Sequence, residues 1–175
     1  MVDPKSRETP YSTHLWQLVF DVVSQVRMDD KRSNVRFYPD FEVVKAYTAT
    51  YGSPEHGSVQ TVIKKAAPKP VPELLRGTSL LLTKSEKGVR RVIIYLTDGR
   101  SGTPRELKQA VEEVRGEAIE MFAVGVGQET DPAELDTIAD SSYDGNHLHR
   151  LIEPLKSEMD AVALELTRAL CGGGR

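Results

Sequence analysis

The clearest feature of the hydrophobic pattern is a continuous apolar run, Val92-Ile93-Ile94-Tyr95-Leu96. The run is too short for a helix and has no polar alternation, so it predicts a strand buried on both faces in the middle of a mostly parallel sheet. It stops at Thr97-Asp98-Gly99, where Gly99 permits a turn. Ligands collect at the carboxyl end of such strands. Asp98 is therefore either a polar turn residue or a ligand to something bound there.

Two more strands and several helices follow from the same kind of pattern. Residues 119–127 predict a second buried strand, and residues 147–151 predict a brief third one. Apolar residues three and four apart predict amphipathic helices. They cover residues 12 to about 28, 58–67, 103–116, 131–139 and the segment after Pro154, in which Leu155, Met159, Val162, Leu166 and Leu170 would point inward.

The region before the first buried strand mixes shorter signals. Residues 35–37 and 42–48 alternate around a turn at residues 38–41, which predicts an antiparallel hairpin at a sheet edge. The prolines of residues 68–72 indicate a semi-rigid connector. Residues 74–82 then predict a loop, Arg76-Gly77-Thr78-Ser79, that leads into a short helix.

The order of these elements defines the fold class. Strands that alternate with helices imply right-handed crossovers, so we expect an α/β fold with a doubly wound, mostly parallel sheet covered by helices on both faces. Residues 1–175 predict a single domain, with an extended lead-in at residues 1–11 and a flexible tail at residues 172–175.

Composition excludes several functions. The 175 residues are 39% hydrophobic and 28% charged, which is typical of a soluble globular chain. A formal net charge of −3 predicts no general attraction to nucleic acid, and no apolar run is long enough to insert in a membrane. Met1-Val2-Asp3-Pro4 lacks the charged-then-apolar order of a secretory signal. The single cysteine, Cys171, is a buried small residue, a free thiol, or half of a disulfide to another segment.

Three motifs together resemble the von Willebrand factor A domain. They are residues 96–101 (LTDGRS), residues 121–127 (MFAVGVG) and residues 134–139 (ELDTIA). The ending at residues 165–171 (ELTRALC) is similar to the ends of such domains in matrix and fibril-associated collagens. The resemblance implies cell adhesion or matrix assembly, secretion, and often a divalent cation at the carboxyl end of the sheet.

The metal ion-dependent adhesion site that the family implies is degenerate in this sequence. Asp98 matches the ligand of the third metal loop and Thr78 that of the second, while Asp3 lies near the place of the first. Lys5 and Arg7 occupy the positions where hydroxyl ligands would be expected. Since Mg²⁺ prefers several hard oxygen ligands, a site made of Asp98, Thr78 and Asp3 is less expected than no cation at all.

Without a cation, the loops at the carboxyl end would bind a protein ligand by shape and hydrogen bonds. The residues expected in this role are Gly99, Arg100, Ser101, Gly77 and Ser79.

The resemblance also implies a central strand before the first helix, and only Met1-Val2 precedes Asp3. Three explanations stay open: a chain without its beginning, a rearranged sheet in which the hairpin docks beside residues 92–96, or a strand supplied by a partner.

Other candidate chemistry is weak. His147 and His149 would point to one face of an edge strand, where they are expected to be ordinary surface histidines rather than metal ligands. Gly125-Val126-Gly127 lacks the third glycine of a nucleotide loop, and no nucleophile elbow surrounds Ser101. The protein is therefore not expected to be an enzyme.

The sequence predicts an extracellular, protein-binding adhesion module. The alternative is an intracellular scaffold domain of a metal-insertion or ATPase-linked complex, which the single cysteine would suit.

Overall fold

A computed structural model describes residues 12–25, 42–43, 63–64, 70–84, 90–139 and 147–171. Five helices and five strands lie in these ranges. In chain order they are α1 Ser12–Gln25, β1 Glu42–Val43, β2 Ile63–Lys64, α2 Val71–Thr83, β3 Val92–Thr97, α3 Pro104–Gly116, β4 Glu120–Val126, α4 Pro132–Ile138, β5 Leu148–Leu151 and α5 Lys156–Cys171.

The main sheet has the order β3-β4-β5, and both neighbouring pairs are parallel. The register aligns Thr97 with Gly125 and Gly125 with Arg150, which form one row across the carboxyl end of the sheet. The predicted parallel α/β class is confirmed. The prediction that residues 92–96 lie in the middle was wrong within the described ranges: β4 is the central strand and is buried along its whole length, while β3 pairs with β4 on one side.

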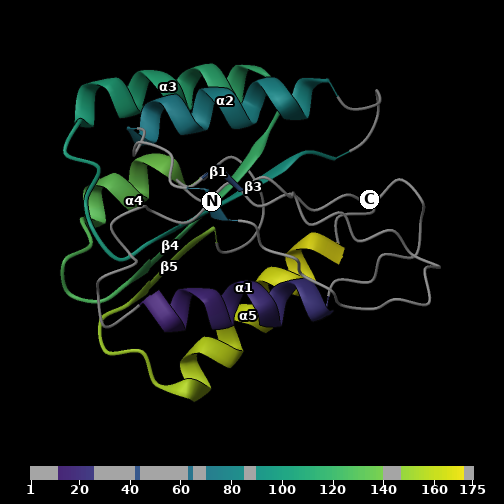
Figure 1. Cartoon of the computed structure of the whole chain (residues 1–175), viewed down its shortest axis with the longest axis vertical. Helices are drawn as coiled ribbons and strands as arrows, with labels where there is room; N and C mark the ends of the chain where they lie inside the picture. Colours follow the sequence, from purple (N-terminus) through teal and green to yellow (C-terminus); the bar gives the residue numbers. More distant parts are fainter. Residues whose placement is uncertain are drawn as a thin grey trace.

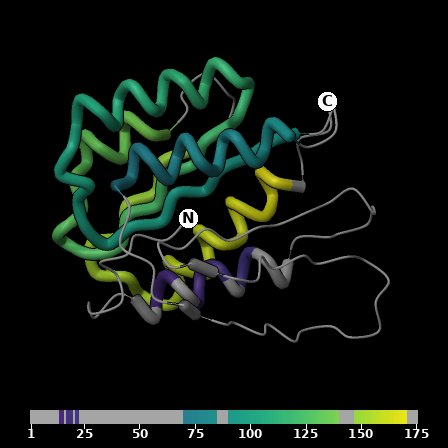
Figure 2. The backbone as a smooth tube through the Cα atoms, turned by 45° about the horizontal axis from the view of Figure 1, so that its top comes forward, coloured from purple at the N-terminus to yellow at the C-terminus, as the bar shows by residue number. Residues whose placement is uncertain are grey.

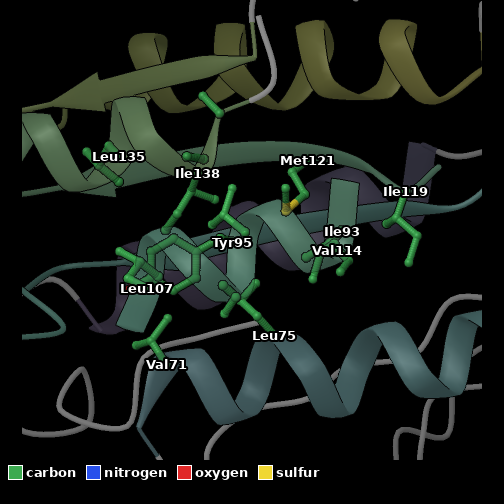
Figure 3. Packing of buried hydrophobic residues seen from close by; sticks show 14 residues of the cluster. Val71, Leu75, Ile93, Tyr95, Leu107, Val114, Ile119, Met121, Leu135 and Ile138 are labelled. Atoms are coloured by element: carbon green, nitrogen blue, oxygen red, sulfur yellow. The ribbon is translucent and has the colours of Figure 1, made fainter. Parts of the chain in front are cut away.

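One face of the sheet is covered by α2, α3 and α4 (Figure 1). Tyr95 of β3 and Met121 of β4 are completely buried there. In Figure 3, Tyr95 lies near Leu107 of α3, and Met121 lies near Val114 of the same helix. The stripe of α3 consists of Leu107, Ala110, Val111 and Val114, as the spacing predicts. These contacts exclude water from one side of every strand in the sheet, which is the main stabilising term of the fold.

The opposite face is covered by α1 and α5, which pack side by side (Figures 1 and 2). Leu15, Leu18 and Val22 of α1 meet Met159 and Leu166 of α5 over the alternate residues of β3 and β4. Helices on both faces confirm the doubly wound arrangement. In α5 one predicted core position was wrong: Leu155 lies before the helix and is 63% exposed.

The short sheet β1-β2 corrects one prediction and adds a partner for residues 42–43. Ile63 and Lys64 form a strand antiparallel to Val43 and Glu42, so the helix predicted over residues 58–67 is wrong at these positions. The partner of residues 42–43 is therefore this strand, and residues 35–37 lie outside the described ranges. A short apolar run fits either a helix or a strand. Here the run forms a strand because it pairs with a segment that is distant in the sequence.

Helix α2 is longer than predicted. It begins at Val71, with Pro72 in its first turn, and it runs through the residues expected to form a loop, Arg76-Gly77-Thr78-Ser79. Proline suits the first turn of a helix because its missing N–H has no partner there anyway. The cost of Gly77 inside the helix is about 1 kcal/mol, and burial of Val71 and Leu75 against the sheet offsets it.

None of the helices in the described ranges is both long enough and apolar enough to cross a bilayer.

Candidate functional site

The carboxyl end of the sheet begins where β3 ends at Thr97. The Thr97 hydroxyl accepts a hydrogen bond from the Gly99 amide at 3.1 Å, which closes a tight turn around Asp98. Asp98 itself is 2% exposed. The predicted turn is therefore present, and it encloses the Asp98 side chain instead of presenting it to solvent.

The loop after β3 is fixed to α4. The carboxylate of Glu134 accepts the Ser101 amide with both oxygens, at 2.8 and 3.0 Å. Glu134 lies in the first turn of α4, whose N-cap is Asp131. The Asp131 carboxylate accepts the Ala133 amide at 2.9 Å, as the cap motif predicts. The equivalent residue of α3, Thr103, occupies the N-cap position without a side-chain capping bond.

Two arginines contact the loop between β4 and α4 (residues 127–131), and they come from two different parts of the chain. Arg100, from the loop after β3, donates from Nε to the carbonyl of Glu129 at 3.3 Å. Arg150, from β5, donates from Nε to the Thr130 hydroxyl at 3.4 Å. That hydroxyl donates in turn to the Gly127 carbonyl at 3.0 Å. The loop after β3 and strand β5 therefore both hold the loop at residues 127–131.

Gly125 lies directly beneath this loop. A Cβ at position 125 would come within 2.5 Å of Leu135 Cδ1 and 3.1 Å of Thr130 Cγ2. The absence of a side chain therefore lets the loop and α4 pack closely on β4. Gly127 has a φ of 97°, a conformation that glycine adopts without the steric cost other residues incur.

Thr78 does not lie in a loop at this rim. It is the eighth residue of α2, and its hydroxyl donates to the Leu74 carbonyl at 2.8 Å. Val71, at the start of α2, packs near Leu107 (Figure 3). Seven residues separate Val71 from Thr78, which is about 10 Å along a helix. Thr78 therefore bonds within its own helix, while Asp98 lies buried in the turn after β3.

The other predicted site residues are spread more widely. Gly99, Arg100 and Ser101 lie together in the loop after β3, whereas Gly77 and Ser79 lie inside α2. Asp3 is outside the described ranges. Cys171 is the last residue of α5, and its side chain is not described. Within the described ranges no group of three or more His, Cys, Asp or Glu side chains could hold a metal ion.

A buried ionic cluster at the opposite, amino end of the sheet was not predicted. Glu120, at the start of β4, is 4% exposed. Its carboxylate accepts Arg90 Nε and Nη2 at 2.8 and 2.6 Å and lies 2.8 Å from His147 Nε2. Arg90 also donates to the carbonyls of Ala169 and Leu170 in the last turn of α5. The cluster therefore joins β3, β4, β5 and α5.

The two histidines near β5 correct another prediction. They were expected on the surface, but His147 and His149 are 5% and 6% exposed. The His147 ring stacks on Phe122 with centroids 4.2 Å apart, and His149 Nδ1 lies 3.7 Å from the Glu165 carboxylate of α5. Their shared face was read correctly, but that face is covered by α5. A glutamate inside the apolar run of residues 119–126 was the one signal that could have revealed a buried charge here.

Comparison with known proteins finds a matching family model. Residues 72–151 match the family model of the von Willebrand factor type A domain. The human collagen alpha-1(XXI) chain is 30% identical over 105 residues, which cover 58% of this chain and 11% of the collagen chain.

Solved structures support the same fold. Proximal thread matrix protein 1 from the mussel byssus is similar over 97% of this chain and 46% of its own, with a TM-score of 0.68 and 16% identity. Another structure of this mussel protein, with a zinc-occupied MIDAS motif, has a TM-score of 0.64 at 15% identity, over 97% of this chain and 44% of the mussel chain. The chain thus spans less than half the length of each of these relatives.

Proposed function

Since residues 72–151 belong to the von Willebrand factor type A domain family, we propose that this protein is a non-enzymatic, protein-binding module of the extracellular matrix. Its ligand would bind at the carboxyl end of the sheet, on the loops at residues 98–103, 127–131 and 152–155. The collagen and the byssus matrix protein named above are both matrix proteins, and this supports the extracellular location.

The observation that carries the proposal is the bonding of the first two loops to each other and to their neighbours α4 and β5. Ser101 is held by Glu134, Arg100 reaches the carbonyl of Glu129, and Arg150 reaches Thr130. Loops fixed in this way lose little conformational entropy when a ligand binds, so more of the contact energy appears as affinity. Exposed residues on each loop, among them Gly102, Gln128 and Leu155, offer a contact surface.

Recognition at this rim would not need a cation. The 2% exposure of Asp98 and the hydrogen bond from Thr78 to the Leu74 carbonyl support recognition without a cation. Titration of MgCl2 and ZnCl2 to millimolar concentration should leave the thermal unfolding midpoint unchanged, for wild type and for Asp98→Ala alike. A site filled at a hundredfold excess over its dissociation constant would add about 2.7 kcal/mol. A saturable rise in wild type alone would contradict cation-free recognition.

Binding to purified matrix proteins tests the function itself. Wild type would be measured by biolayer interferometry against a panel of immobilised fibrillar collagens and matrix glycoproteins. Gln128→Trp places a large ring on an exposed position of the loop at residues 127–131, and it should weaken binding at least tenfold. Gln109→Trp, on the exposed side of α3, is the matched control and should bind as wild type does. No binding to any member of the panel, or equal binding by both variants, would overturn the proposal.

A further inference from the structure

Arg100 and Arg150 come from different elements and meet at adjacent residues of one loop. Arg100 follows β3 and contacts Glu129, while Arg150 belongs to β5 and contacts Thr130. The loop at residues 127–131 thus has a guanidinium group on each side. Both arginine side chains belong to exposed residues, so these cations face solvent at the carboxyl end of the sheet.

Each guanidinium group keeps most of its donors for a ligand. Among the described residues, each arginine makes the one hydrogen bond given above, through Nε. Arginine carries five N–H donors in a planar fork that matches the two oxygens of a carboxylate. Anchoring through Nε restricts the side chain and leaves the two Nη groups to bind, so part of the entropy cost is met before a ligand arrives.

Most acidic side chains nearby are already occupied by backbone amides. Glu134 accepts the Ser101 amide, Asp131 accepts the Ala133 amide, and Glu158 accepts the Leu155 amide at 3.1 Å. Glu129 and Glu153 are the exposed carboxylates left beside the two arginines. The arginines therefore face a small number of competing local charges: Glu153 is three residues from Arg150 along the chain, and the carbonyl of Glu129 accepts the bond from Arg100.

We propose that Arg100 and Arg150 bind carboxylate groups of an acidic segment in the protein ligand, in place of a bound cation. The inference rests on the proposed function and specifies the chemistry of the partner. A segment with two or more aspartate or glutamate side chains would span the loop, with one carboxylate at each guanidinium group.

A blocked hexaglutamate peptide is a suitable probe, with hexaglutamine as its neutral control. The full chain would be titrated at low salt and followed by NMR through the Arg Nε–Hε signals. Hexaglutamate should bind saturably and shift the signals of Arg100 and Arg150, and hexaglutamine should not. Added NaCl should weaken the binding, because exposed charges are screened within about 10 Å at 0.1 M.

Four variants decide the outcome, each checked for an unchanged thermal midpoint. Arg100→Gln with Arg150→Gln should weaken hexaglutamate binding at least tenfold, and replacing both arginines with lysine should restore part of it. Arg168→Gln removes the same charge from the exposed side of α5 near the amino end and should have no effect. Glu129→Gln should strengthen binding two- to threefold. No saturable binding, or equal loss in the double variant and Arg168→Gln, would overturn the inference.

The two proposals can fail separately. Binding to matrix proteins that is sensitive to Gln128→Trp but insensitive to the double arginine variant would remove the acidic-segment inference and keep the function. The absence of any matrix-protein binding by wild type would remove the function, whatever hexaglutamate does.

Discussion

At the carboxyl end of the sheet, carboxylates are bound by backbone amides, whereas at the amino end a carboxylate is bound by cationic and imidazole side chains. Glu134 accepts the Ser101 amide at the first end, while Glu120 accepts Arg90 and contacts His147 at the second. The first arrangement orders loops and leaves Arg100 exposed. The second buries the Glu120 carboxylate and joins β strands to the last turn of α5 through Arg90. We therefore expect substitutions at the amino end to change mainly stability, and substitutions of exposed residues at the carboxyl end to change mainly the proposed binding.

Removal of Glu120 should have the largest effect on stability. It tests most directly whether the amino end of the sheet holds the fold together. Glu120→Ala leaves His147 buried without its carboxylate partner and Arg90 without its main one. Breaking a fully buried ion pair from one side costs about 3–5 kcal/mol, and the 34% exposure of the Arg90 side chain places the expected loss at the lower end of that range. We expect a loss of that order in the free energy of unfolding from urea titration, with hexaglutamate binding retained by the folded fraction. A loss below about 1 kcal/mol would show that the amino end is not the stabilising one.

Gly125 lies in the row of aligned residues across the carboxyl end of the sheet. Substitution of Gly125 tests how tightly the residues at this end are packed. Gly125→Ala should cost about 1–3 kcal/mol, because its methyl group would press on Leu135 and Thr130 in a close-packed site. Gly77→Ala is the matched control: nothing lies within 4 Å of the new methyl group, and alanine should stabilise the interior of α2 by about 0.5–1 kcal/mol. Equal effects in the two variants would mean that the rim has room to relax.

The N-cap residues of α4 and α3, both at the carboxyl end of the sheet, should differ in their contribution to stability. Asp131→Ala removes the capping bond to Ala133 and should cost about 1 kcal/mol. Thr103→Ala should change stability far less, since the Thr103 hydroxyl makes no capping bond to α3. Both losses are read from the midpoint of urea denaturation. A larger loss for Thr103→Ala would contradict the assignment of the caps.

The difference between the two ends also explains what could be predicted from the sequence. Thr97-Asp98-Gly99 and Asp131-Pro132 are local signals, because each motif forms its own turn or cap from neighbouring residues. The cluster of Arg90, Glu120 and His147 has no local signature, since its members are about 30 residues apart and meet only when β3, β4 and β5 align. The helical position of Thr78 was missed for a related reason: Gly77 favours a loop locally, and packing of Leu75 on the sheet overrides it.

The exposed ion pair Arg76–Glu113 joins α2 and α3. Its removal should have the smallest effect on the free energy of unfolding, and this effect is the reference for the cluster around Glu120. The hydrogen bond from Arg76 lowers the pKa of Glu113 below its ordinary value of 4.5, and the same bond raises the pKa of Arg76. A lowered folded-state pKa means that the pair stabilises the protein above pH 4.5, and that this contribution disappears as the pH falls through the folded-state pKa. Wild type should therefore be slightly more stable than Glu113→Gln at neutral pH, and the difference should vanish in acid and shrink in 1 M NaCl. In Arg90–Glu120 the same pair of residue types has a buried carboxylate. A Glu113→Gln effect as large as that of Glu120→Ala would therefore show that burial of the carboxylate is not what separates the amino end from the surface.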